Sequence, residues 1–345
     1  MRLFPRGRPP PGRGKTRENT RVVHGCEEVW CGSTVGRVNR SHRGAHMHIV
    51  PSPTSTACPA RRRGHLRLVG GQEHPSPTPA RPAGAHDAAT DYARFYAPIT
   101  SRLMDPLLDA AHVGDGTRVL DVATGAGCLT ARAAQRGACA VGVDLDAAMV
   151  GLARRRHPGL EFRQADVEAL PFADGTFDAV VGNFLVHHLR SPTKAIAELV
   201  RVLAPGGILA LSAWDLPSRT RLVGVFLEAI DDCDTSDPQV APARAGFFHY
   251  SADPALAGLL SEVGLDHVAV ATRAFDHPVA STEELWTGLF AGTDTTSATR
   301  ISRQRPEVQR RIRASFERRA NEYWTGERLE LPVSAKVACG RRLAA

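Results

Sequence analysis

The sequence predicts an α/β fold built on a doubly wound, mostly parallel sheet. From Arg118 onward, short apolar strands alternate with helical stretches, and parallel strands need such crossover helices. Of the 345 residues, 43% are hydrophobic, which is enough to fill a sizeable core between a sheet and its helices. Order is expected to begin near Asp87, so that residues 86–345 form one folded domain.

Residues 1–85 have a different composition. Pro, Gly, Arg and His predominate there without sustained apolar periodicity, so we predict a disordered basic extension. The formal charge is +10 over residues 1–90 and −3 over residues 91–345. Attraction of nucleic acid is therefore an argument about the extension alone, and a dispensable extension is the favoured interpretation. Its cysteines and histidines fit no familiar zinc spacing, and no metal site is predicted.

The beginning of the chain lacks the apolar stretch of a secretory signal. No apolar run approaches the roughly 18 residues that span a bilayer, so no membrane span is expected. The seven cysteines are an odd number spread over the whole chain. We therefore expect reduced thiols and a cytoplasmic location.

The predicted folded domain opens with a helix and continues with five strands. Helical apolar spacing runs through "ATDYARFYAPITSRLMDPLLDAA". The strands that follow are "RVLDVAT", "CAVGVDLD", "LEFRQAD", "FDAVVGNFL" and "GILALSAWD". Between them we expect a first helix closed by Gly137 and a second running from Met149 to Arg155.

The clearest helix signal follows the fourth strand. Ser191 is a natural N-cap and Pro192 suits the first helical position. "PGG" at 205–207 is expected to end this helix and turn the chain into the fifth strand. Residues 216–345 are interpreted as two helices, the strand "DHVAVATRAF", two further helices and the last strand "LPVSAKVACG". The mostly helical excursion over about 277–330 is a candidate lid.

Polar groups stand at the ends of the predicted strands. Ligands of open α/β sheets bind outside the carboxyl ends of the strands. This rule brings five residues to one rim, each from its own strand: Asp121, Asp144, Asp166, Asn183 and Trp214.

The glycine turn in "VLDVATGAG" indicates which ligand this rim suits. Gly125 and Gly127 match the first two glycines of the dinucleotide fingerprint, but Thr130 replaces the third. Asp121 would repel a pyrophosphate by about 1–4 kcal/mol for each close charge pair. The same carboxylate attracts a cation, and S-adenosylmethionine carries both a sulfonium and an α-ammonium. The alternative interpretation of Asp121 is that it caps the following helix.

Residues 118–215 resemble the core of a class I S-adenosylmethionine-dependent methyltransferase, of the type-11 group that includes quinone-biosynthesis enzymes. The family's first motif, an acid followed by three alternate glycines, reads here as Asp121, Ala123, Gly125 and Gly127, with alanine in place of the first glycine. The resemblance implies a Rossmann-like, seven-stranded sheet whose last strand is antiparallel. It also implies S-adenosylmethionine as the cofactor.

The resemblance assigns further cofactor contacts. Asp144 would bind the ribose hydroxyls, and Asp166 the adenine amino group. Leu145 and Val167 would cover the two adenine faces. The remaining implied cofactor contacts are Tyr92, Met149 and Asn183, although Tyr92 and Met149 are equally well explained as core packing.

Fewer sequence features indicate which residues would bind or deprotonate the methyl acceptor. His187 or His188 would act as a general base, because an unperturbed histidine pKa of about 6.5 suits proton removal near neutrality; packing and a backbone hydrogen bond are the alternative. Four aromatic residues are expected to contact the substrate, and packing between helices explains them as well: Phe184, Trp214, Phe248 and Trp286.

The expected function is methyl transfer to an oxygen, nitrogen or activated carbon of a small, largely apolar metabolite. The sequence after the fourth strand, "NFLV", lacks the Asn/Asp-Pro-Pro-aromatic pattern of nucleobase amino-methylating enzymes, and the folded part is not basic. We expect a monomer or homodimer that does not bind nucleic acid. Two alternatives stay open: an NAD(P)-dependent oxidoreductase, and a non-catalytic module that binds a partner through its basic extension.

Overall fold

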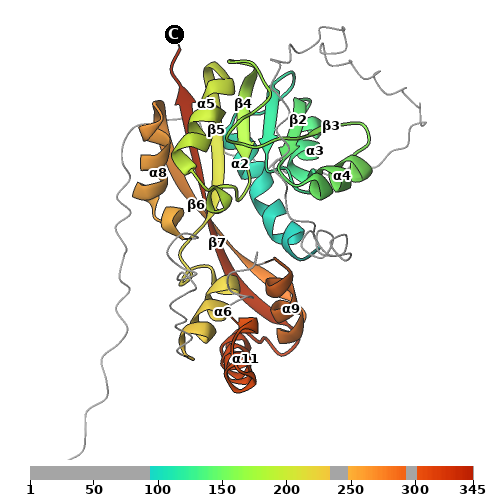
Figure 1. The fold of residues 1–345 in the computed structure, drawn as a ribbon, viewed down its shortest axis with the longest axis vertical. Coiled ribbons are helices and arrows are strands. Elements are labelled where there is room, and N and C mark those ends of the chain that lie inside the picture. The colour runs from blue at the N-terminus through green and yellow to red at the C-terminus, as the bar shows by residue number, and fades with distance from the viewer. Residues whose placement is uncertain (1–93, 234–247, 293–300, 345) are drawn as a thin grey trace, which may run out of the picture. The chain divides into compact units, whose positions relative to one another are not determined.

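Seven strands form one sheet in the order β3-β2-β1-β4-β5-β7-β6 (Figure 1). The computed structural model describes residues 94–233, 248–292 and 301–344. The predicted extension 1–85 and Tyr92 lie outside the described residues. The strands are β1 (Arg118–Val122), β2 (Cys139–Asp144), β3 (Glu161–Gln164), β4 (Phe177–Gly182), β5 (Leu203–Trp214), β6 (Leu265–Val279) and β7 (Leu329–Arg342).

The strand directions are those of the predicted fold. Strands β1 to β5 pair in parallel. Strand β7 lies between β5 and β6 and is antiparallel to both. The prediction of a mostly parallel, seven-stranded sheet with an antiparallel last strand is therefore confirmed. The carboxyl ends of β1 to β5 consequently meet at one edge, as the predicted rim requires.

Helices cover both faces of the sheet. They are α2 (Met104–Ala110), α3 (Cys128–Gln135), α4 (Ala147–Arg156), α5 (Pro192–Val202), α6 (Arg221–Asp231), α8 (Asp253–Glu262), α9 (Thr282–Gly292) and α11 (Pro306–Asn321). Residues 94–100 are also helical, and short 3-10 turns are η2 (Ser101–Leu103), η3 (Val186–His188) and η4 (His249–Ser251). One buried cluster joins the sheet to α2, α3 and α6, and a second joins it to α5 and α8.

Of two local expectations about α5, the N-cap position is confirmed and the terminating turn is wrong. Ser191 occupies the N-cap position before Pro192, but its side chain makes no capping hydrogen bond. The helix ends at Val202, ahead of "PGG". Leu203 already pairs with Phe177, and the register then shifts so that Ala179 pairs with Ile208. The glycine turn is thus accommodated as an irregularity inside β5, with Gly206 at φ 78°.

Among the described residues of the excursion predicted over 277–330, α9 and α11 are helical. Strand β6 continues to Val279, which pairs with Leu329 at the start of β7. These two strands extend beyond the rest of the sheet, and α6, α9 and α11 gather around their far end (Figure 1). The fully buried rings of Phe226 and Phe316 lie among these helices. We call α6, α9, α11 and this end of the β6–β7 pair the helical lobe.

The described residues lack two kinds of feature. None of their helices is long and apolar enough to cross a bilayer. Among the same residues, no group of three or more His, Cys, Asp and Glu side chains is arranged to hold a metal ion.

Candidate active site

The turn between β1 and α3 runs through left-handed backbone. Ala123 has φ 55°, Gly125 has φ 55° and Gly127 has φ 84°. A Cβ on Gly127 would lie 2.7 Å from the Phe162 ring, so packing as well as φ requires glycine there. A Cβ on Gly125 would meet nothing within 4 Å. The space beside Gly125 is therefore open to a ligand that approaches the backbone closely.

Asp121 supports this turn from within the protein. It is 1% exposed, and its Oδ2 accepts hydrogen bonds from Thr124 Oγ1 and Thr130 Oγ1, both at 2.7 Å. The Thr130 backbone N–H, in the first turn of α3, also bonds to this carboxyl group. Burial raises the Asp121 pKa to about 6, despite the opposing effect of these donors. The carboxylate thus caps α3 and adds negative charge behind the turn, while presenting almost no surface to a ligand.

Asp144 connects the turn to the end of β2 through a hydrogen bond. Its Oδ2 accepts from the Gly125 N–H at 2.8 Å, and its Oδ1 accepts from the Asp146 N–H at 2.9 Å. Burial raises the pKa of this carboxyl group above its usual value. Because an ionised carboxylate offers about four acceptor positions, two remain for hydroxyl groups of a ligand.

Apolar and acidic groups follow the ends of β2 and β3. Leu145 is 59% exposed, which is unusual for a leucine beside a glycine turn. Met149 is half-buried on α4, and Val167 is half-buried against the core. Asp166 Oδ1 accepts from the Glu168 N–H at 2.9 Å. Exposed apolar surface between acids suits a flat ring that carries polar edges.

The chain after β4 carries the next group of predicted site residues. Asn183 Nδ2 donates to the Thr100 carbonyl oxygen at 3.0 Å, and its Oδ1 accepts from Ser212 Oγ at 2.7 Å. Phe184 is buried at a left-handed φ of 55°. Its ring centroid lies 4.2 Å from that of Trp214, which is 4% exposed at the end of β5.

The histidine pair lies in η3, one turn further along. The two ring centroids are 4.1 Å apart. His187 is half-buried and His188 is exposed. Burial lowers the His187 pKa well below its usual value, and the adjacent His188 lowers it further. His187 is therefore neutral at pH 7, the state in which an imidazole accepts a proton.

Trp286 lies inside the helical lobe. Its ring contacts Phe226, Phe290 and Phe316, with centroid distances of 5.5, 4.7 and 4.9 Å, and the Arg313 guanidinium lies 4.8 Å from its centroid. Phe248 is half-buried against the same apolar cluster. None of these contacts places Trp286 or Phe248 beside the glycine turn. Their role toward a substrate stays a prediction.

The group implied by the resemblance is S-adenosylmethionine, and the residues present fit it. Open space beside Gly125 accommodates a closely approaching ligand, and exposed Leu145 provides apolar cover. Asp144 retains acceptor positions for hydroxyl groups beside that space. The two acids near the turn favour a cationic ligand over an anionic one.

Comparison with known proteins gives the same assignment. Residues 120–211 match the family model described as a methyltransferase domain. This part of the chain is therefore similar to methyltransferase domains. The match begins within β1 and ends within β5, so it takes in all five parallel strands that carry the candidate site.

Several curated relatives match part of this chain. A demethylmenaquinone methyltransferase of Renibacterium salmoninarum is 39% identical over 119 residues, covering 34% of this chain and 50% of the relative. That of Thermus thermophilus is 44% identical over 108 residues, covering 30% and 49%. An uncharacterised protein of Mycobacterium tuberculosis is 37% identical over 131 residues, covering 37% and 48%. The chain thus spans about half the length of the curated relatives it matches.

Among solved structures, the YcgJ protein of Bacillus subtilis covers 71% of this chain and 100% of its own, with 19% identity and a TM-score of 0.46. The putative methyltransferase BH2331 of Bacillus halodurans covers 70% of this chain and 99% of its own, with 20% identity and a TM-score of 0.44.

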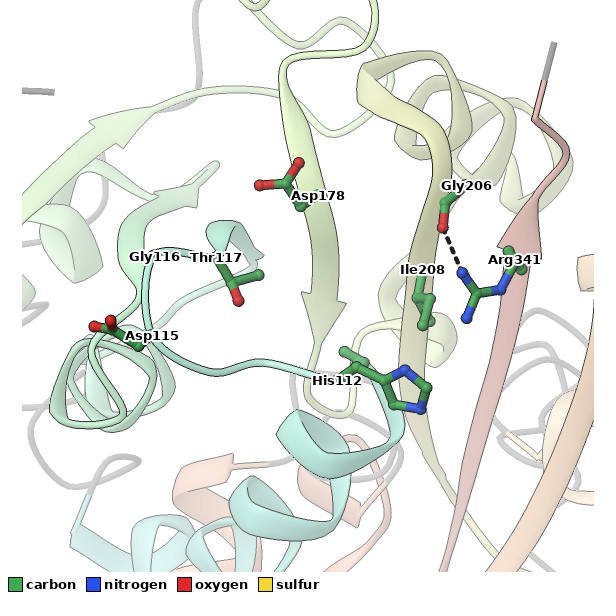
Figure 2. A pocket seen from close by; sticks show the side chains of 9 residues that line it. His112, Asp115, Gly116, Thr117, Asp178, Gly206, Ile208 and Arg341 are labelled. Atoms are coloured by element: carbon green, nitrogen blue, oxygen red, sulfur yellow. Dashed lines mark hydrogen bonds between the residues drawn. The ribbon is translucent and has the colours of Figure 1, made fainter. Parts of the chain in front are cut away.

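Two surface hollows lie away from the glycine turn. One, of about 390 Å³, is at the amino edge of the parallel strands and is lined by His112, Asp178 and Arg341 among others (Figure 2). The other, of about 370 Å³, is lined by Ser281, Thr282, Asn321 and Trp324. We place the candidate site at the carboxyl edge instead, because the parallel strands present their acids and the glycine turn there.

Sequence reasoning missed three hydroxyl residues that organise the site. Thr124 and Thr130 hold Asp121, and Ser212 holds Asn183. Thr130 was visible as the residue that replaces a glycine, and its polarity three positions into α3 is a signal for a bond to a nearby acid. Ser212 gives no such signal, because its partners come from another strand.

Replacing Ala123 by glycine is expected to stabilise the protein. A left-handed conformation costs a non-glycine residue about 1–2 kcal/mol, and glycine loses about 0.5–1 kcal/mol of this gain through backbone entropy. Ala123→Gly should therefore raise the free energy of unfolding in urea by up to about 1 kcal/mol. The matched control Ala131→Gly, within α3, should lower it by about 1 kcal/mol. Equal losses in the two variants would contradict the strain at Ala123.

The raised pKa of Asp121 makes stability depend on pH. Between the ordinary value of 3.8 and the folded value of about 6, the folded state holds a proton that the unfolded state releases. Stability from this group is therefore complete below pH 4 and is lost as the pH rises to 6, by about 3 kcal/mol in all. Urea unfolding at pH 4 and pH 7 should show this loss in the native chain and not in Asp121→Asn. An identical pH dependence in both proteins would refute it.

Proposed function

We propose that this chain transfers the methyl group of S-adenosylmethionine to an oxygen, nitrogen or activated carbon of a small, largely apolar metabolite. The observation that carries the proposal is the junction of Gly125 and Asp144. A carboxylate bonded to the backbone of an open glycine turn, with Asp121 buried behind it, binds hydroxyl groups and repels phosphate. A cationic nucleoside meets both conditions, whereas a pyrophosphate-containing dinucleotide meets only the first.

The residues around this junction would hold the cofactor by its polar edges and faces. Asp144 would accept hydrogen bonds from the ribose hydroxyls, and Asp166 from the adenine amino group. Leu145 and Val167 would cover the ring. When bound, the cofactor supplies an activated methyl group on its sulfonium. The contribution of the protein is then to align the acceptor and exclude water.

The acceptor would lie near Phe184 and Trp214. These stacked rings provide a buried apolar wall at the carboxyl ends of β4 and β5. The curated relatives that are demethylmenaquinone methyltransferases make quinones and phenols the first acceptors to test. We further propose that the folded domain works as a monomer or homodimer on such small molecules, without nucleic acid.

A proton must leave an acceptor hydroxyl or amine during methylation, and we propose that the histidine pair removes it. His187 remains neutral well below pH 6.5, so it stays competent to accept a proton under mildly acidic conditions. Its low basicity suits acceptors that are themselves acidic, such as phenols.

Asp144→Asn is expected to weaken binding of S-adenosylhomocysteine by about 1–3 kcal/mol, because charge-assisted bonds to the ribose are lost. Calorimetric titration measures this directly. The matched control is Asp178→Asn, a strand aspartate paired with Arg118 at the opposite edge of the sheet, which should leave the dissociation constant unchanged. The native chain should not bind NADH. Unaltered binding by Asp144→Asn, or binding of NADH by the native chain, would overturn the proposal.

Removal of the base should slow turnover without weakening the cofactor complex. His187→Ala is expected to lower kcat by about 10²-fold or more under saturating S-adenosylmethionine. In the native enzyme the acidic limb of the pH–rate profile should lie below pH 6.5, because the His187 pKa is lowered. Labelled cofactor and a panel of quinones and phenols provide the assay. Full rates in both His187→Ala and His188→Ala would show that neither is the base.

A further inference from the structure

A chain of hydrogen bonds links the middle of the sheet to the first described helix. Ser212, in β5, is 0% exposed. Its hydroxyl accepts from the Phe184 N–H at 2.7 Å and donates to Asn183 Oδ1 at 2.7 Å. Asn183 Nδ2 then donates to the Thr100 carbonyl oxygen at 3.0 Å. One buried hydroxyl thus connects β5, the segment after β4 and residues 94–103.

The donors and acceptors permit only one direction along this chain. Because Ser212 accepts from a backbone N–H, its single proton is available for Asn183 Oδ1. A rotated carboxamide would turn Oδ1 toward the Thr100 carbonyl, placing two acceptors together. The orientation of Asn183 therefore depends on the Ser212 hydroxyl.

The same hydroxyl holds strained backbone. Phe184 is a non-glycine residue at φ 55°, a conformation that costs of order 1–3 kcal/mol and persists where surrounding contacts impose it. The bond from its N–H to Ser212 is one such contact, and the stacking of its ring on Trp214 is another. Loss of the Ser212 hydroxyl removes the hydrogen bond to the Phe184 N–H and leaves the ring contact with Trp214.

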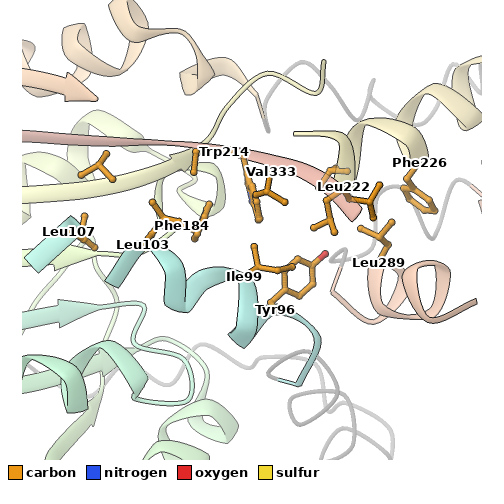
Figure 3. Packing of buried hydrophobic residues seen from close by; sticks show 14 of the residues in the cluster. Tyr96, Ile99, Leu103, Leu107, Phe184, Trp214, Leu222, Phe226, Leu289 and Val333 are labelled. Atoms are coloured by element: carbon orange, nitrogen blue, oxygen red, sulfur yellow. The ribbon is translucent and has the colours of Figure 1, made fainter. Parts of the chain in front are cut away.

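Residues 94–103 dock at the same place. Tyr96, Ile99 and Leu103 are buried in the cluster that contains Phe184 and Trp214 (Figure 3). The helix over 94–100 continues directly into η2, and the Thr100 carbonyl at this junction accepts the hydrogen bond from Asn183. Apolar packing thus holds the segment against the sheet, and the hydrogen bond fixes its position along the carboxyl edge.

We propose that Ser212 is a positioning residue, which couples the docking of residues 94–103 to the Phe184 wall of the acceptor site. Its effect on methyl transfer rests on the function proposed above, but the coupling itself does not. When the hydroxyl is present, Asn183, Phe184 and Thr100 are held as one unit. Without it, residues 94–103 open independently of the rest of the domain.

Amide hydrogen exchange in the full-length chain tests the coupling. Ser212→Ala should accelerate exchange in residues 94–103 on the order of tenfold, the effect of one lost hydrogen bond. Asn183→Ala should do the same, and the double variant should add little, because both act through one chain. Ser212→Thr, which keeps the hydroxyl, should restore slow exchange. The matched control Ser315→Ala removes a buried hydroxyl that bonds to Asp232 in the helical lobe, and it should leave residues 94–103 unchanged.

A second measurement separates the coupling from the proposed function. Saturating S-adenosylhomocysteine should slow exchange in residues 94–103 of the native chain, and should do so less in Ser212→Ala. If the native chain does not bind S-adenosylhomocysteine, the proposed function fails while the ligand-free exchange result still decides the coupling. Unchanged exchange at 94–103 in both Ser212→Ala and Asn183→Ala overturns the coupling. So does an acceleration that is uniform over the whole domain.

Discussion

The site depends on a left-handed stretch of backbone that two aspartate side chains hold by hydrogen bonds. Three residues of the β1–α3 turn have left-handed φ, and one of them is an alanine. Asp144 bonds to the middle of this turn from the end of β2, and Asp121 caps the helix that follows. The same two acids that make the turn possible also set its electrostatic character. Structure and electrostatic character therefore depend on the same two side chains.

The fold and the rim were largely predictable because they follow from local patterns. Alternation of apolar strands and helices indicates a parallel sheet, and an acid that ends a strand must lie at its carboxyl edge. The position of Asp144 follows from this rule alone, whereas the role of Leu145 was implied by the family resemblance. The expectations that the structure does not bear out depend on how neighbouring helices and strands compete for the same residues. Ser191 has the right residue type for a cap without forming the bond, and "PGG" lies inside β5 because pairing with β4 begins before it.

Buried side-chain partners from distant strands were not predictable. Ser212 bonds to both Asn183 and Phe184, yet its sequence context "ILALSAW" is that of any buried strand. Its importance arises from register, because pairing of β4 with β5 brings it beside Asn183. A single sequence does not show which side chains from separate segments will meet once the strands are paired. Strain at Ala123 and Phe184 is equally hidden, since neither residue type indicates a left-handed conformation.

The register of β7 on β6 places a buried lysine among polar partners. Lys336, in β7, is 3% exposed, and its Nζ lies 2.7 Å from both Asp253 Oδ1 and Thr272 Oγ1, and 3.6 Å from Asp215 Oδ2. A buried ammonium is costly unless its partners are in place, and a slip of one residue would turn its side chain to the other face of the sheet. Asp215 directly follows Trp214 at the end of β5. Lys336 therefore links β7 to β6, to the first residue of α8 and to the residue that follows Trp214.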